Sequence, residues 1–254
     1  MPSPSRKLKT ITGFVAFIDL VGFSDLIGPE NSIVSKGSIE ILNKIIMGIT
    51  NRIEYDKKEF PELSYIFISD TIIVWCETKF FSDLVWKICQ IQNTILRRGM
   101  LTRGALTYGN IHVLVDANSN SRDAPTGINI FGAAYVQAYQ LHDRAAKYPR
   151  IVLSDVAYKT AYTNKDNDDT LKYLVRKDRD GWYIVRQFGR QIFYRELNPK
   201  KRVNSWPKKS MNEIIEVIDS GCKKYRNDPH KREKWRWIKN HYQEDKALPA
   251  RIEP

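Results

Sequence analysis

The stretch FVAFIDL, residues 14–20, is apolar except for Asp19, and it sets the pattern for the first part of the chain. A short apolar run of this kind is typical of a buried strand. A second run, LSYIFISDTIIVWC at residues 63–76, is rich in β-branched and aromatic residues but breaks at the sequence SDT around Asp70. This break predicts a β-hairpin with Asp70 at its tip.

The segments between and after these runs alternate between helix and strand patterns. Apolar residues recur at spacings of three and four, which predicts amphipathic helices at residues 32–55, 81–97 and 131–147. Residues 100–115 are apolar but contain Gly104 and Gly109, so we predict two strands joined by a turn, with a further strand at 150–153. The order β-α-β-β-α-β, followed by additions, predicts an α+β, ferredoxin-like split βαβ fold.

The last part of the chain has a different composition. Two short strands are predicted near residues 171–175 and 182–185, with Asp180-Gly181 as the hairpin signal between them. A basic, proline-containing stretch then precedes two helical segments, at residues 211–225 and 231–242. We therefore predict a folded domain at residues 10–197 and a basic helical C-terminal extension at residues 198–254 that packs on it.

The positive charge is concentrated in this extension. The 254 residues carry 41 Lys and Arg against 29 Asp and Glu, a formal charge of +12, and residues 198–254 hold 15 of the former and 8 of the latter. Such a balance points to a polyanionic partner, or to a basic, solvated surface. The segment KWRWI at residues 234–238 is compatible with nucleic-acid binding or with a structural brace on the domain, and we favour the brace.

Other features exclude whole classes of protein. No apolar run reaches about 18 residues, so we expect no membrane-spanning helix and no membrane partner. The basic N-terminus is not followed by an apolar signal-peptide core. Cys76, Cys89 and Cys222 lie far apart without a C-x-x-C pair, which favours neither a disulfide framework nor a zinc site. These observations predict a cytoplasmic protein.

Asp19 and Asp70 are the most informative pair of residues. In a split βαβ sheet the first strand and the hairpin lie side by side, so two carboxylates at adjacent strand ends would repel each other without a cation. Carboxylate oxygens suit Mg²⁺ or Mn²⁺. The alternative is a pair of capping or turn residues. Next to Asp19, a short segment containing Gly22 would present backbone N–H groups to phosphates; its residues are Leu20, Val21, Gly22, Phe23 and Ser24.

Four segments, at residues 17–26, 65–75, 97–113 and 129–141, resemble motifs of class III nucleotidyl cyclases. FIDLVGFSDL is similar to their F-x-D-I-x-G-F segment, and YIFISDTIIVW to their second metal hairpin. RRGMLTRGALTYGNIHV resembles their R-x-G-x-x-x-G strands, and NIFGAAYVQAYQL the start of their last core helix. The resemblance implies a nucleotidyl cyclase domain that pairs head to tail as a homodimer. It also implies two divalent cations, Mn²⁺ or Mg²⁺, held by Asp19, Asp70 and the Leu20 carbonyl.

Departures from the family pattern concern the substrate. Ile66 and Asn129 stand where adenylyl cyclases have the Lys and Asp that bind adenine, and Val136 and Gln140 replace the usual Asn and Arg of the last helix. Two explanations fit these departures. The domain is a non-catalytic relic, or it belongs to a branch of the family that uses other base-binding residues. Short segments such as FGAAYVQAY resemble the pyrimidine cyclases of the Pycsar anti-phage system. That resemblance implies UTP or CTP as substrate, with UTP preferred, and a separate effector activated by cUMP or cCMP.

The remaining candidates are Arg103, Tyr65 and Asn129. A guanidinium at position 103 would bind polyphosphate, stabilise the transition state or donate to a uracil carbonyl, and the alternative is a surface salt bridge. Asn129 has both a donor and an acceptor for a pyrimidine edge, whereas Tyr65 is a base contact or a core residue. His112 and His142 are interpreted as structural. The alternative functions are a cytidylate cyclase, a purine cyclase with unusual base-binding residues, and a non-catalytic module that binds nucleic acid through its basic extension; nucleic acid is not the expected partner.

Overall fold

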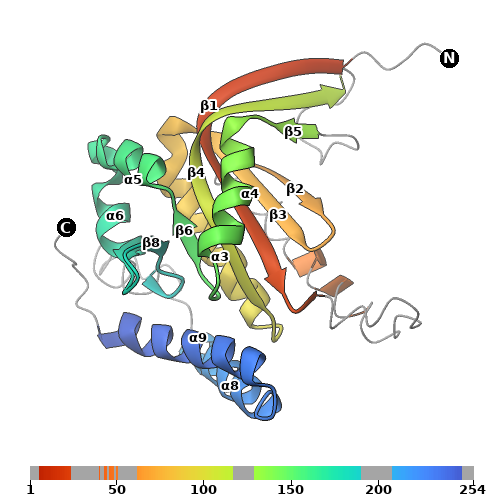
Figure 1. The fold of residues 1–254 in the computed structure, drawn as a ribbon, viewed down its shortest axis with the longest axis vertical. Coiled ribbons are helices and arrows are strands. Elements are labelled where there is room, and N and C mark those ends of the chain that lie inside the picture. Colours follow the sequence, from red (N-terminus) through yellow and green to blue (C-terminus); the bar gives the residue numbers. More distant parts are fainter. Residues whose placement is uncertain are drawn as a thin grey trace.

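The computed structural model describes residues 6–23, 62–116, 129–189 and 208–247, with a few helical positions between residues 40 and 50. Within these residues one sheet of eight strands runs through the molecule in the order β2-β3-β1-β4-β6-β8-β7, with β5 paired to β4 (Figure 1). The strands are β1 (Arg6–Val21), β2 (Ser64–Ile68), β3 (Thr71–Glu77), β4 (Leu101–Asp116), β5 (Asn129–Phe131), β6 (Ile151–Leu153), β7 (Val175–Lys177) and β8 (Tyr183–Val185).

β1 is the central strand that places the candidate site. It pairs antiparallel with β3 on one side and antiparallel with β4 on the other. The hairpin strands β2 and β3 are joined by the two-residue turn Ser69–Asp70, as the sequence predicts. The arrangement β2-β3-β1-β4 is that of a split βαβ unit, and the predicted α+β fold is confirmed.

Helices cover both faces of the sheet because the side chains of β1 alternate between two apolar clusters. Phe14 and Ile18 belong to the cluster that includes α3 (Phe81–Leu96), whereas Val15 and Phe17 belong to the cluster that includes α4 (Ala133–Ala145). In Figure 1, α4 lies in front of β1 and β4, and α3 lies behind them. This alternation explains why residues 14–20 form a nearly continuous apolar run: both faces are buried.

Two sequence-based expectations about strands are wrong. Residues 100–115 do not form two strands and a turn, because β4 continues from Leu101 to Asp116. Gly104 is needed because β1 and β4 approach each other closely here, and not because the chain turns. A Cβ at this position would lie 2.1 Å from the Phe17 carbonyl oxygen. The stretch predicted as a strand at residues 171–175 belongs to α6 (Asp168–Leu174), and only Val175 begins β7.

We expect Gly104→Ala to lower the free energy of unfolding by about 3 kcal/mol, because β1 and β4 must separate to admit the methyl group. Asn110→Ala is the control, since Asn110 is exposed on the same strand. Urea denaturation of both variants measures the difference. A loss below about 1 kcal/mol at Gly104 would show that the two strands separate easily at this position.

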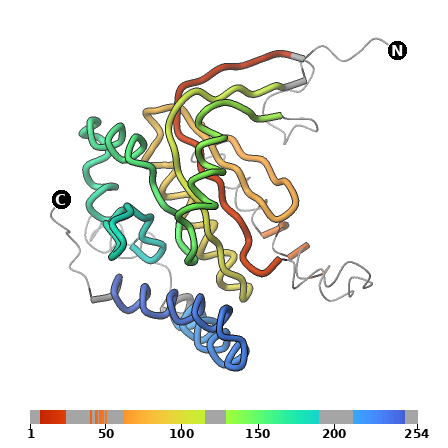
Figure 2. The backbone as a smooth tube through the Cα atoms, in the orientation of Figure 1, coloured from red at the N-terminus to blue at the C-terminus, as the bar shows by residue number. Residues whose placement is uncertain are grey.

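The C-terminal helices α8 (Lys208–Lys224) and α9 (Pro229–Ala247) pack against the domain (Figure 2). They share an apolar cluster with α3 and β4, and its buried members are Leu96, Leu101, Phe188, Ile214, Ile218, Trp235, Ile238 and Tyr242. Trp237 stacks on Tyr148, with ring centroids 5.8 Å apart. Tryptophans of the extension therefore contribute to packing, as expected of a brace.

A buried charged cluster fastens the end of α9 to β7 and β8. The Arg186 Nε donates to Asp245 Oδ1 over 3.1 Å, and the two side chains are 0% and 1% exposed. Arg176 Nη2 donates to His241 Nδ1 over 2.5 Å. Burial lowers the pKa of His241, which keeps the imidazole neutral and able to accept this hydrogen bond.

The remaining elements are α5 (Asp155–Tyr162), which packs on β4 beside α6, and two short 3-10 turns at Thr78–Phe80 and Lys165–Asn167. Most of the helix predicted at residues 32–55 lies outside the described residues. Among the helices that the structure describes, none is both long and apolar enough to cross a bilayer.

Candidate functional site

The two candidate metal ligands lie at the same end of the sheet. Asp19 pairs with Thr71 in the β1–β3 register and with Arg103 in the β1–β4 register, so it lies between the hairpin and β4. Asp70 occupies the hairpin turn immediately before Thr71. The Leu20 N–H donates to the Asp70 carbonyl oxygen over 3.0 Å, which joins the end of β1 to the turn.

Asp19 has two basic partners in this structure. Arg103 Nε donates to Asp19 Oδ2 over 2.8 Å, and His142 Nε2 on α4 lies 3.4 Å from the same oxygen. Burial raises the pKa of Asp19, but hydrogen bonding and charge from His142 and Arg103 outweigh it, so the pKa lies below its usual value. Asp19 is therefore an ionised carboxylate at neutral pH, as a ligand for a cation must be.

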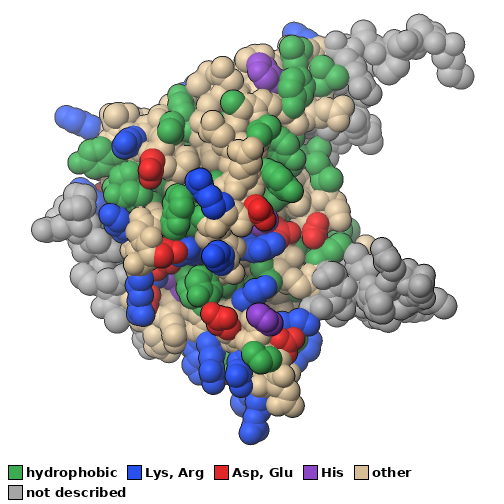
Figure 3. All heavy atoms as spheres, viewed as in Figure 1, with side chains coloured by type: hydrophobic (Ala, Val, Ile, Leu, Met, Phe, Trp, Pro, Cys, Tyr) green, Lys and Arg blue, Asp and Glu red, His purple; other side chains and the backbone are tan. Residues whose placement is uncertain are grey.

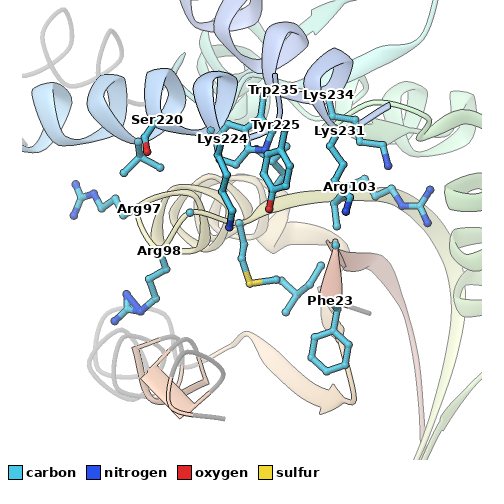
Figure 4. Close-up of a pocket in the computed structure, with 18 of the residues that line it drawn as sticks. Phe23, Arg97, Arg98, Arg103, Ser220, Lys224, Tyr225, Lys231, Lys234 and Trp235 are labelled. Atoms are coloured by element: carbon cyan, nitrogen blue, oxygen red, sulfur yellow. The ribbon is translucent and has the colours of Figure 1, made fainter. Parts of the chain in front are cut away.

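A cavity of about 1030 Å³ opens beside this pair (Figure 4). Residues from β1, from the hairpin turn, from the α3–β4 connection and from both C-terminal helices line it. Its ionisable members include two carboxylates and six basic groups: Asp19, Asp70, Arg97, Arg98, Arg103, Lys224, Lys231 and Lys234. The cavity is thus strongly cationic around a pair of acidic side chains.

The turn after β1 lines the same cavity. Leu20, Val21, Gly22 and Phe23 all contribute to its wall. Gly22 has φ of 86°, a left-handed conformation that a side chain disfavours, so the glycine is required for this turn. Ser24 lies outside the described residues.

Tyr65 and Asn129 are not among the residues that line the cavity. Tyr65 packs against the α3-side cluster, with its ring centroid 6.2 Å from that of Phe67. Asn129 pairs with Leu114, eleven positions beyond Arg103 on β4, which is roughly 36 Å along an extended strand. Within one chain the structure therefore does not bring Asn129 to Asp19.

The donor set fits a divalent cation of the Mg²⁺ type. Such an ion takes one or two carboxylates from the protein and completes its shell with water and phosphate oxygens. Asp19 and Asp70 line one cavity, and the Asp19 carboxyl is ionised. Among the described residues no group of three or more His, Cys, Asp and Glu is placed to hold a metal, so a cation held by these two carboxylates would take its other ligands from water and phosphate oxygens.

Sequence-based reasoning did not predict that two groups of residues lie at the site. His142 was interpreted as structural, but it approaches Asp19, which is 123 positions away in sequence. The lysines of α8 and α9 were assigned to an extension outside the site, but they form one wall of the cavity. The sequence pattern does not reveal that His142 or these lysines lie near Asp19. Their positions depend on how α4 and the extension pack against the sheet.

Comparison with known proteins supports the fold. The sequence matches no protein-family model and no curated protein. The adenylyl cyclase CyaB from P. aeruginosa is similar in structure with a TM-score of 0.50 and 13% identity, over 70% of this chain and 95% of that chain. The chain has a nucleotidyl cyclase fold.

Two further cyclase-related structures are similar, at lower TM-scores. The guanylate cyclase domain of RhGC from Catenaria anguillulae, solved in complex with GTP, has a TM-score of 0.49 and 16% identity over 70% of this chain and 97% of that one. A class III adenylyl cyclase-like ATP-binding protein from Pseudomonas aeruginosa has a TM-score of 0.45 and 12% identity. That match covers 60% of this chain and 35% of the other, so it spans about a third of that protein's length.

Proposed function

We propose that this protein is a nucleotidyl cyclase that converts a pyrimidine nucleoside triphosphate, preferentially UTP, to the 3′,5′-cyclic nucleotide and pyrophosphate. The observation that carries the proposal is the convergence of Asp19, Asp70 and Arg103 on one cationic cavity within a nucleotidyl cyclase fold. A triphosphate is the small polyanion that such a cavity suits, and paired carboxylates supply the cation ligands.

The residues of the cavity divide the work as follows. Asp19 and Asp70 would hold two Mg²⁺ or Mn²⁺ ions, with the Leu20 carbonyl as a further ligand. When bound, such ions neutralise phosphate charge and favour deprotonation of the attacking hydroxyl. The turn after β1 would hold the phosphates by its backbone N–H groups, while Arg103 stabilises the charge that develops as the ribose 3′ oxygen bonds to the α-phosphorus and pyrophosphate leaves.

The complete site is proposed to form between two copies of the chain. Asn129, the proposed base-binding residue, is too distant from Asp19 within one chain, so it would serve the site of a second copy. The outer face of α4 suits an interface, because Val136 and Tyr139 on it are 49% and 56% exposed. In a homodimer these two apolar side chains, three positions apart on one helix face, would be covered by the second copy.

The preference for a pyrimidine rests on the residues at the positions that bind the purine in adenylyl cyclases. Ile66 packs, partly buried, against the apolar cluster that includes α4, and its aliphatic side chain has no polar group to bind a base. Asn129 stands at the second of these positions and offers both a donor and an acceptor. The resemblance to pyrimidine cyclases extends the proposal to anti-phage signalling, in which cUMP, or cCMP in the alternative, activates a separate effector.

The substrate is tested by incubating the purified protein with ATP, GTP, CTP and UTP separately in Mn²⁺ and identifying the product by mass spectrometry. We expect cUMP as the main product, with CTP turned over at least about tenfold more slowly, which corresponds to about 1.4 kcal/mol of discrimination. Cyclic product from ATP or GTP alone would contradict the pyrimidine assignment. Absence of any cyclic product, with no binding of Mn²⁺, would contradict the cyclase proposal itself.

The alternative of a nucleic-acid-binding module receives less support from the extension. Trp235 is 4% exposed, and the Trp237 ring stacks on the rings of Tyr148 and His241, so both tryptophans are engaged in packing within the protein. Binding through lysine and arginine alone would be weak in sequence preference and steeply dependent on salt.

A further inference from the structure

The C-terminal extension contributes one wall of the candidate site. Lys and Arg side chains gather toward the α8–α9 end of the molecule (Figure 3). In Figure 4, Lys224, Lys231 and Lys234 extend from the helix pair toward the strand that carries Arg103, whereas Arg97 and Arg98 lie to one side. The three lysines line the same cavity as Asp19 and Asp70.

The turn between the helices places these lysines together. α8 ends at Lys224 and α9 begins at Pro229, whose missing N–H suits the first helical position. The Asp228 carboxylate accepts from the Lys231 N–H over 3.0 Å and caps α9. As a result, the last residue of one helix and the first turn of the next face the same cavity.

Close packing of the two helices fixes this geometry. A Cβ at Gly221 would lie 2.3 Å from the Trp235 ring, so α8 and α9 approach each other at this glycine as closely as backbone and indole allow. Trp235 is itself buried in the cluster shared with α3 and β4. The three lysines therefore stand on helices whose position relative to the domain is fixed by packing.

Two of the ammonium groups converge on one ring. The Nζ atoms of Lys224 and Lys231 lie 5.1 Å and 5.5 Å from the centroid of Tyr225, which also lines the cavity. Lys231 Nζ also lies 3.5 Å from Asp228 Oδ2, while the other oxygen of that carboxylate, Oδ1, accepts the hydrogen bond that caps α9, so Asp228 offsets part of the charge of this lysine. Six basic side chains and two carboxylates line the cavity, and this excess of positive charge favours a bound anion.

We propose that Lys224, Lys231 and Lys234 form a polyphosphate subsite, through which the C-terminal extension binds the terminal phosphates of the substrate within the same chain. Lysine ammonium groups bind phosphate as point charges with several donors, while Arg103, with Asp19 and Asp70 as the residues that would hold cations, lies nearer the reacting end. The identity of the natural ligand rests on the proposed cyclase function; the affinity for polyphosphate does not.

Inorganic tripolyphosphate is the probe, titrated by calorimetry into the full chain in EDTA so that cations make no contribution. We expect the triple substitution Lys224→Gln, Lys231→Gln and Lys234→Gln to weaken binding at least about tenfold. The matched control is Lys223→Gln, Arg236→Gln and Lys239→Gln, which removes the same charge from the same two helices at exposed positions outside the cavity wall. We expect this control to weaken binding less than about threefold, since diffuse charge alone is screened by salt.

The outcomes of these titrations decide between the proposals. An equal loss in both triple variants, or no loss in either, overturns the subsite. Loss of affinity for a single-stranded oligonucleotide in the Lys224, Lys231 and Lys234 variant, with tripolyphosphate binding unchanged, also overturns it. Selective loss of tripolyphosphate binding without any cyclic product from the wild-type chain supports the subsite and contradicts the cyclase. Unchanged binding, and an unchanged KM in a chain that forms cyclic product, contradicts the subsite alone.

Discussion

Replacing either Asp19 or Asp70 with asparagine is expected to lower nucleotide cyclisation by about a thousandfold. Asparagine has nearly the same shape as aspartate but lacks its charge, so each variant loses a cation ligand while the packing around β1 is kept. A catalytic cation contributes several kcal/mol to transition-state stabilisation, and each 1.36 kcal/mol corresponds to a factor of ten. The measurement is the rate of cyclic product formation at saturating Mn²⁺.

The control for this prediction is Asp143→Asn. Asp143 is exposed on α4 next to His142 and does not line the cavity. We expect its turnover to stay within about twofold of the wild type. Asp70→Asn and Asp143→Asn are expected to keep their thermal midpoint, whereas Asp19→Asn loses the ion pair with Arg103 and is expected to have a lower midpoint while staying folded at the assay temperature. If either Asp19→Asn or Asp70→Asn retains most of the activity in a folded chain, that residue does not belong to the metal site.

Asp245→Ala is expected to cost about 3–5 kcal/mol of the free energy of unfolding, the typical loss when one partner of a buried ion pair is removed. Arg186 is fully buried and donates to Asp245 Oδ1, and Arg176 Nε lies 3.8 Å from the same oxygen. The substitution leaves these two guanidinium groups without their shared carboxylate. Guanidinium denaturation of the full chain measures the loss.

An exposed ion pair between α8 and α9 provides the comparison. Lys239 Nζ lies 2.8 Å from Asp219 Oδ1, with both side chains almost half exposed. Asp219→Ala is expected to cost less than about 1 kcal/mol, because solvent screens this pair. A similar, small loss in both variants would mean that the end of α9 separates from β7 and β8 independently of global unfolding.

Much of the sheet follows from local pattern. The run at residues 14–20 and the hairpin around Asp70 are correctly predicted because β-branched and aromatic residues bounded by a polar break have few alternatives. The turn predicted from the glycines of β4 is absent, since β4 is continuous from Leu101 to Asp116. Gly104 is required by the close approach of Phe17, and glycine spacing within one chain does not distinguish such a contact from a turn.

The candidate site was predictable only in part. Asp19 and Asp70 follow from strand ends that a split βαβ order places side by side, and Arg103 follows from its place before Gly104. His142 has no distinguishing neighbours in sequence, and it approaches Asp19 because α4 packs across β1. The position of Asn129 at the far end of β4 also follows only from strand register.

The sequence by itself determined the central strands, the paired carboxylates and the excess of positive charge after residue 198, since these depend on residue type and short spacing. Only the tertiary structure decided where that charge acts. Trp235 and its apolar neighbours hold α8 and α9 against α3 and β4, and this packing turns the lysines of the extension toward Asp19 and Asp70. Long-range burial of apolar side chains, which no local pattern encodes, therefore combines the extension and the carboxylate pair into one cavity.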